Sequence, residues 1–108
     1  MKGDRLGEFE ELTLLAVRAL GDRTYGVPVQ QFVERATGRN VTMGAVYAAL
    51  DRLEQKEFVR SVLGDPSPMR GGKRKRLFEV TSLGLRTAQD LRRVRERIWQ
   101  TIEAGRRS

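Results

Sequence analysis

The chain has 108 residues, of which 39% are hydrophobic and 32% are charged, and its formal net charge is +7. This length fits a single small domain with one core, and the sequence has no apolar run close to the ~18 residues that a membrane span needs. Histidine and cysteine are both absent, which excludes disulfides, thiolate metal sites and the commonest general base, so we expect neither an enzyme nor a cofactor.

Two helices are predicted in the first 40 residues. The segment from Leu6 to Leu20 has apolar side chains at spacings of three and four residues, which is typical of a largely buried helix. The residues expected on its buried face are Phe9, Leu12, Leu15, Ala16 and Ala19, with Leu14, Val17 and Leu20 widening it. The second helix is expected to have Pro28 in its first turn and to end at Gly38.

The third predicted helix, Thr42 to Lys56, has two contrasting faces. Thr42 can cap its first turn. Its core-spaced residues are Val46, Ala49, Leu50 and Leu53. The opposite face has small side chains and one aromatic side chain, Tyr47, where a solvated helix face would have more Glu and Lys. Such a face suits a helix that enters a groove, although Tyr47 packed against a neighbouring loop is the alternative.

Two short strands and a fourth helix complete the prediction. Phe58–Leu63 and Arg76–Thr81 are rich in β-branched and aromatic residues and predict an antiparallel hairpin, which must pack on the helices because two strands alone are marginally stable. A long helix is expected to start at Thr81 or Ser82. The fold class is therefore mainly α with a small β-hairpin: a winged helix-turn-helix domain over residues 1–81, followed by a C-terminal helix over residues 82–108.

The positive charge is concentrated after Leu63. Residues 1–63 contain nine basic and nine acidic residues, residues 64–82 contain five and two, and residues 83–108 contain seven and three. This asymmetry favours a polyanionic partner that one region of the molecule contacts, double-stranded DNA above all, and a basic surface that only aids solubility is the alternative. The N-terminus lacks the apolar segment of a signal peptide, so we expect a cytoplasmic, nucleoid-associated protein with no membrane partner.

Several segments together resemble the PadR family of bacterial transcriptional regulators. They are LGEFEELTLLAVRAL, YGVPV, VTMGAVYAALDRLEQKEFV, GGKRKRLFEVTSLG and the closing long helix, and together they cover roughly residues 6–103. The most specific part is the G-x-x-Y-x-x-L-x-x-L-E run from Gly44 to Glu54. The resemblance implies a homodimeric DNA-binding repressor or autoregulator whose C-terminal helix forms the dimer.

One residue departs from the family pattern. The family usually has glycine after the recognition helix, where this chain has Glu57. A glutamate held at positive φ would cost about 1 kcal/mol. Either this helix ends differently or the protein gives up some stability at this position.

The third helix is expected to lie in the major groove with its N-terminal residues at the base edges. Met43 suits apolar contact with a thymine methyl group, and the Tyr47 hydroxyl suits a phosphate or a base. The full set of expected DNA contacts in and before this helix is Tyr25, Thr42, Met43, Gly44, Tyr47 and Arg52. Thr42 acting only as a cap, and Tyr25 buried in the domain, are the alternatives. The operator sequence is not readable from these residue types.

The loop between the two strands is expected to be the wing of the domain. Its glycines allow close approach to the duplex while its basic side chains meet phosphates or the minor groove. The residues expected to contact DNA are Arg70, Gly71, Gly72, Lys73, Arg74 and Lys75. A solvated basic loop is the alternative.

The last helix has more apolar surface than a small domain can cover. Pairing with a second copy would bury the surplus, so a homodimer is expected. The dimerisation residues are expected to be Leu91, Val94, Ile98, Trp99 and Ile102. Trp99 either packs in the dimer core or forms one wall of a pocket for a small aromatic effector, as the family resemblance allows.

A sequence-specific DNA-binding regulator is thus the predicted function. The competing hypothesis is a winged-helix protein-interaction module or a basic RNA-associated module, which would show little preference for duplex DNA over single strands. An enzyme is disfavoured, because no paired acid and base constellation and no phosphate-binding glycine motif occurs in the sequence.

Overall fold

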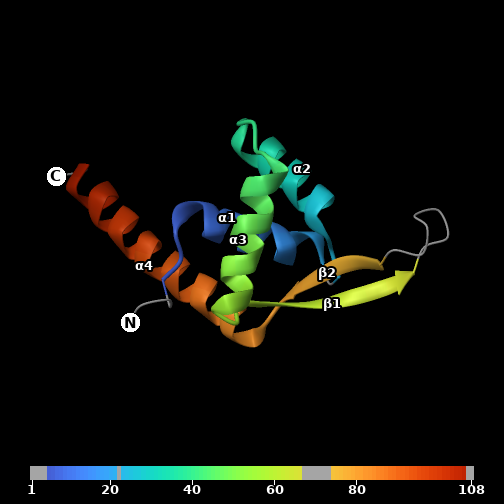
Figure 1. The fold of residues 1–108 in the computed structure, drawn as a ribbon. Helices are drawn as coiled ribbons and strands as arrows, with labels where there is room; N and C mark the ends of the chain where they lie inside the picture. The colour runs from blue at the N-terminus through green and yellow to red at the C-terminus, as the bar shows by residue number, and fades with distance from the viewer. Residues whose placement is uncertain (1–4, 22, 67–73, 107–108) are drawn as a thin grey trace.

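The structure is a computed structural model that describes residues 5–21, 23–66 and 74–106. Figure 1 shows its elements, which are α1 (Glu8–Leu20), α2 (Gly26–Thr37), α3 (Met43–Gln55), β1 (Val59–Pro66), β2 (Arg74–Val80) and α4 (Ser82–Arg106). The predicted order of three helices, two strands and a final helix is confirmed. Among the described residues, no helix is both long and apolar enough to cross a membrane.

The core lies where α1, α2 and α3 pack together and the base of the hairpin closes the space between them. Phe78 from β2 is fully buried among Leu14, Val17, Leu50 and Leu53 of this core. Val46 and Ala49 are also fully buried, so the predicted core face of the third helix is confirmed.

The buried face of α1 differs from the prediction. Thr13, Leu14, Ala16 and Val17 are buried, whereas Leu15 is 44% exposed. The apolar stripe of this helix is wide enough to meet two different surroundings: one side packs on α2 and α3, while Leu15 borders a hollow beside α4. Periodicity alone does not tell which part of a wide stripe is covered within the protomer.

The ends of the helices follow the capping residues. The Thr42 hydroxyl accepts a hydrogen bond from the Ala45 N–H at 3.1 Å, and Gly38 ends α2 in the left-handed conformation, with φ at 71°. The Thr81 hydroxyl accepts a hydrogen bond from the Gly84 N–H at 3.0 Å and therefore caps α4. Glu57 has φ at 64°, so the strained alternative for this position is the one that occurs.

The hairpin is anchored at its base. Its register pairs Val59 with Val80 and Ser61 with Phe78, and an irregularity follows Leu63. On the opposite edge of β2, Phe78 exchanges two backbone hydrogen bonds with Thr24, at 2.7 and 3.2 Å. The base of the hairpin is thus hydrogen-bonded to the segment before α2, and the other end projects from the body of the molecule (Figure 1).

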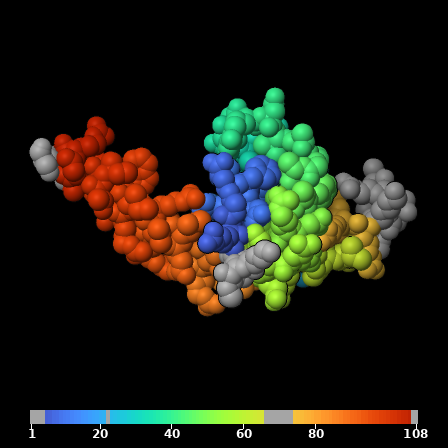
Figure 2. Space-filling view, turned by 60° about the vertical axis from the view of Figure 1, so that its left-hand side comes forward, coloured from blue at the N-terminus to red at the C-terminus, as the bar shows by residue number. Residues whose placement is uncertain are grey.

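The fourth helix leaves the body at a point set by close backbone contact. A Cβ atom on Gly84 would lie 2.1 Å from the carbonyl oxygen of Phe58. The C-terminal part of the helix projects from the body of the molecule (Figure 2), which measures 64 × 31 × 22 Å along its principal axes. Its expected dimerisation residues are half-buried at Leu91 and exposed at Val94, Ile98, Trp99 and Ile102.

Gly84→Ala is expected to destabilise the fold strongly, by about 3 kcal/mol or more, because the neighbouring atoms are backbone and cannot rotate away. Chemical denaturation followed by circular dichroism measures this free energy. Gly105→Ala is the matched control, since a Cβ atom there meets open space in the same helix, and its stability should be unchanged or slightly raised. Equal stability of the two variants would contradict the close packing of α4 on the backbone of Phe58.

Glu57→Gly is expected to raise the free energy of unfolding by up to about 1 kcal/mol, because glycine adopts the positive φ of this position without strain. Thermal denaturation of the variant provides the measurement. Glu57→Ala is the control: it removes the same carboxylate and keeps the Cβ atom, so it should not be stabilising. If the alanine variant gained as much stability as the glycine variant, the charge and not the backbone would be responsible.

Candidate nucleic-acid interface

The start of α3 is open to solvent and has few bulky side chains. Thr42 and Gly44 are exposed and Met43 is half-buried, and a Cβ atom on Gly44 would meet nothing within 4 Å. The Thr42 hydroxyl already accepts the capping hydrogen bond, so its proton remains as a donor to an outside partner. These three predicted contact residues therefore lie together at the end of the helix that has free backbone N–H groups.

Tyr47 lies on α3 one turn further along and packs across Gly26. Its side chain is 43% exposed, yet a Cβ atom on Gly26 would lie 2.6 Å from its hydroxyl oxygen and 2.7 Å from Cζ. A side chain at position 26 would therefore displace the Tyr47 ring from its present place. Tyr47 combines both alternatives raised by the sequence, because one side of it packs on a neighbouring segment while the rest faces solvent.

Tyr25 connects this surface to the hairpin. It is half-buried just before α2, and the Lys75 ammonium of β2 lies 3.9 Å from the centroid of its ring. Since Tyr25 precedes Gly26, the short segment Tyr25–Gly26 contacts both Tyr47 of α3 and Lys75 of β2. The surfaces predicted for groove and wing contact are therefore adjacent in the fold.

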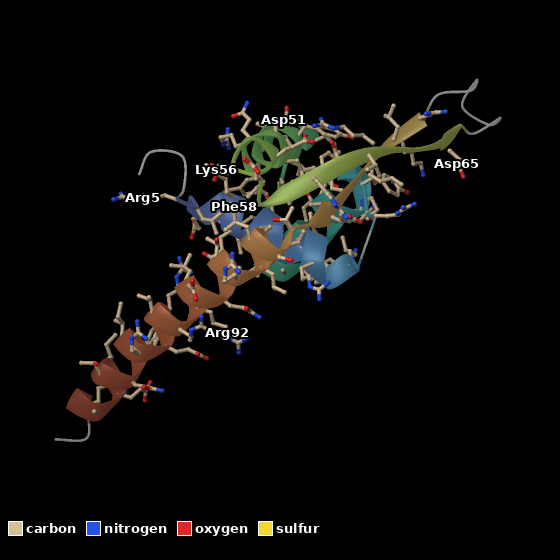
Figure 3. The ribbon with its side chains drawn as sticks, turned by 90° about the horizontal axis from the view of Figure 1, so that it is seen from below. Arg5, Asp51, Lys56, Phe58, Asp65 and Arg92 are labelled. Carbon is tan, nitrogen blue, oxygen red and sulfur yellow. The ribbon has the colours of Figure 1, made fainter. Side chains whose placement is uncertain are left out.

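The tip of the predicted wing is described in part. Arg70, Gly71, Gly72 and Lys73 lie outside the described residues. Arg74, at the start of β2, is exposed, and Lys75 is half-buried. Figure 3 shows the hairpin reaching away from the helices to Asp65.

Arg76 joins the hairpin to α3. Its guanidinium donates to Asp51 Oδ1 at 3.0 Å, to a carboxylate oxygen of Glu54, and to the Ser61 hydroxyl oxygen at 3.2 Å. The hydrogen bond from Ser61 lowers the pKa of Glu54, against the opposing effect of burial, and Arg76 lowers it further. Burial alone would lower the pKa of Arg76, but the hydrogen bonds and charges of Asp51 and Glu54 raise it above its ordinary value.

A second ion-pair group joins α1 to the end of α3. Glu10 is buried, and its carboxylate accepts hydrogen bonds from Arg52 Nε at 2.9 Å and from Lys56 Nζ at 2.5 Å. Burial alone would raise the pKa of Glu10, but these two cations outweigh it and the pKa is lowered. Arg52, a predicted DNA contact, is therefore half-exposed and already paired with a carboxylate.

A hollow of about 530 Å³ lies between α1 and α4. Leu15, Leu85 and Ala88 line its apolar side, Trp99 lies at its outer end, and the buried Glu11 carboxylate pairs with Arg95 at 3.0 Å on its polar side. The predicted ligand-contacting residue Trp99 therefore does border a concave surface.

Comparison with known proteins identifies the class of this protein. A family profile described as "Transcriptional regulator PadR-like family" matches residues 14–90. No curated protein matches the sequence. The chain belongs to the PadR-like family of transcriptional regulators and is a DNA-binding transcription regulator, not an enzyme.

Solved structures share the fold. A PadR-like transcription factor from Bacteroides fragilis superposes with a TM-score of 0.74 and 17% identity, covering 89% of this chain and 87% of the other. A PadR-like transcriptional regulator from Bacillus cereus has a TM-score of 0.70 and 16% identity, covering 93% and 92%. A transcriptional regulator from Clostridium thermocellum has a TM-score of 0.68 and 18% identity, covering 89% and 88%.

The sequence does not predict the roles of two residues that organise this surface. From the sequence alone, Arg76 is expected only as the first residue of a strand, and Gly26 only as part of a family motif. Both depend on contacts between segments more than 20 residues apart.

The lowered pKa values of Glu10 and Glu54 predict how stability depends on pH. Both carboxylates favour the folded state at pH values above the ordinary value of 4.5, and this stabilisation is lost as the pH falls below it. Glu10→Gln is expected to lower the free energy of unfolding by about 1–2 kcal/mol at neutral pH. The difference from wild type should shrink toward acid pH.

Urea titrations at a series of pH values from about 3 to 7 measure this difference. Glu103→Gln is the control, because Glu103 is an exposed carboxylate of α4. The account of Glu10 would be contradicted if its variant differed from wild type by the same amount at every pH.

Proposed function

We propose that the protein is a homodimeric repressor that binds a pseudo-palindromic operator. In this proposal α3 enters the major groove with Thr42, Met43, Gly44 and Tyr47 toward the bases, and the hairpin acts as a wing on the backbone or minor groove. Arg74 and Lys75 are the described cationic residues nearest its tip, and the loop residues Arg70, Gly71, Gly72 and Lys73 are proposed to contact the same duplex. Arg52 and Tyr25 are proposed to contact the phosphate backbone at the edges of this protein surface.

The segment Tyr25–Gly26, which contacts both Tyr47 of α3 and Lys75 of β2, carries this proposal. A major-groove helix and a wing can engage one duplex together only if their contact surfaces are continuous. The packing of Tyr47 over Gly26 and of Lys75 over Tyr25 provides that continuity through one short segment. The excess positive charge of the hairpin region then lies beside the helix that reads the bases.

Dimerisation is proposed from the exposure of α4. Val94 is 41% exposed, Ile98 is 55% exposed and Trp99 is 60% exposed. These side chains follow one another along a helix that projects from the body, and a second copy paired through the same face would remove them from water. Two-fold pairing would place two copies of α3 about one helical turn of DNA apart.

An effector site is proposed for the hollow between α1 and α4. Its apolar wall and the indole of Trp99 suit a small aromatic molecule. Binding there would change the DNA affinity only if the ligand bound the DNA-competent arrangement of the dimer more or less tightly than the alternative arrangement.

Tyr47→Ala is expected to weaken binding to a duplex selected by the protein from a random pool by about tenfold, and to reduce the preference over an unrelated duplex. The double variant Arg74→Gln with Lys75→Gln should weaken binding to both duplexes by a similar factor. It should also make the slope of log K against log salt concentration less steep. If the wild-type dimer neutralises about six to eight phosphates, the slope of log K against log salt concentration should be about −5 to −7.

Fluorescence anisotropy titrations with labelled duplexes at several salt concentrations measure both effects. Arg97→Gln with Arg106→Gln is the matched control, because it removes the same charge from the exposed part of α4, and its slope should stay near that of wild type. Equal binding of single-stranded and duplex DNA by the wild type would favour the RNA-associated or protein-interaction hypothesis instead.

A further inference from the structure

The group formed by Arg76, Asp51, Glu54 and Ser61, here called the Arg76 cluster, links three elements. Arg76 lies on β2, Ser61 lies on β1, and both carboxylates lie on α3. We propose that Arg76 is a positioning residue that fixes the wing relative to α3, and that Asp51 and Glu54 support DNA binding by holding Arg76. This inference rests on the proposed DNA-binding function of the two elements.

The geometry of the cluster defines one orientation of the hairpin. Nη1 of Arg76 donates to Asp51 Oδ1, Nη2 donates to Glu54, and Nε donates to the Ser61 hydroxyl oxygen. The Ser61 hydroxyl in turn donates to the second oxygen of Glu54 at 2.6 Å. A guanidinium is planar and its donors have fixed directions, so engaging all three nitrogens constrains its plane as well as its position.

The position of Arg76 along the strand makes this constraint effective. Phe78, two residues later in the chain and nearer the base, is fully buried, whereas Arg74, two residues earlier and nearer the tip, is exposed. Arg76 is paired in register with Leu63, which is 62% exposed. The cluster therefore holds the hairpin where it leaves the core, and a two-stranded ribbon needs such support to keep one direction.

Side chains on the two faces of β2 contact different parts of the helix-turn-helix motif. Arg76 and Phe78 point to the face that meets α3, and the Arg76 guanidinium lies 4.9 Å from the centroid of the Phe78 ring. Lys75, with the alternate orientation of a strand residue, reaches Tyr25 before α2. The hairpin thus contacts α3 through one face of β2 and the residue before α2 through the other face.

The carboxylates of the cluster are unfavourable for DNA binding when considered as isolated charges. Asp51 is exposed and both acids lie on the helix proposed to enter the groove, where they would repel phosphates (Figure 3). Simple electrostatics predicts that removing them strengthens binding. If their role is to hold Arg76, removing them must weaken binding, so the two explanations predict opposite signs.

The variant Asp51→Asn with Glu54→Gln tests this sign. It raises the net charge by two per chain and does not substitute Arg76 itself. We expect about tenfold weaker binding to the selected duplex, because the wing must then be ordered on binding, and a slope against salt close to that of wild type. Anisotropy titrations measure both quantities, and circular dichroism verifies that the variant is folded.

Two further variants separate geometry from charge. Arg76→Lys keeps the positive charge and loses the planar fork, so it should weaken binding nearly as much as Arg76→Gln. Arg60→Gln is the matched control: Arg60 is 71% exposed in its side chain and pairs with Glu79 within the hairpin, so its loss should leave the wing in place. Wild-type affinity of Arg76→Lys would overturn the proposal.

A measurement without DNA distinguishes this inference from the proposed function. The chain has no native cysteine, so spin labels at Ala48→Cys on α3 and Asp65→Cys near the hairpin tip report one distance within a protomer, in samples diluted with unlabelled protein. Both positions are exposed. We expect double electron–electron resonance to give a narrow distance distribution in the parent and a broader one after Arg76→Gln.

The outcomes are separate for the two claims. An unchanged distance distribution after Arg76→Gln, or tighter DNA binding by the Asp51→Asn, Glu54→Gln variant, would overturn the role of the Arg76 cluster. Failure of the wild-type protein to prefer duplex DNA would overturn the proposed function, while the spin-label distances would still decide whether the cluster positions the hairpin.

Discussion

The burial of Phe78 is the interaction on which the arrangement of this protein depends. A two-stranded hairpin has too little surface of its own to be stable, and here one aromatic side chain inserts into the core of three helices while its backbone pairs with Thr24. This anchoring places Arg76 and Lys75, on either side of the same strand, against different helices. The contact surface that spans α3 and β2 is a consequence of where this one ring is held.

Several ion pairs in this chain connect different elements of the fold. Glu10 links α1 to the end of α3, Glu11 links α1 to α4 through Arg95, and Arg76 links α3 to the hairpin. Most of these pairs have one partly exposed member, so each contributes modestly to stability. Their directional hydrogen bonds nevertheless favour one relative orientation of the elements, which matters for a protein that must match a fixed ligand shape.

Periodicity and capping predicted the elements of the fold well, because those signals are local. The core face of α3, the Thr42 cap and the order of the elements follow from residue types within one turn or one strand. The buried side of α1 was mispredicted, since its wide apolar stripe is divided between the core and the hollow beside α4. The roles of Arg76 and Gly26 depend on which distant segments meet, and a single sequence does not contain that information.

The contact between Gly84 and the carbonyl of Phe58 has a consequence for how this family of chains can diverge. Because main-chain atoms meet there, the start of α4 is held against Phe58 whatever side chains the exposed part of the helix carries. Substitutions at exposed positions such as Val94, Ile98 and Ile102 can therefore change the surface that this helix offers while its start is preserved. The chemistry of the exposed helix and its point of attachment to the body are, in this architecture, separable traits.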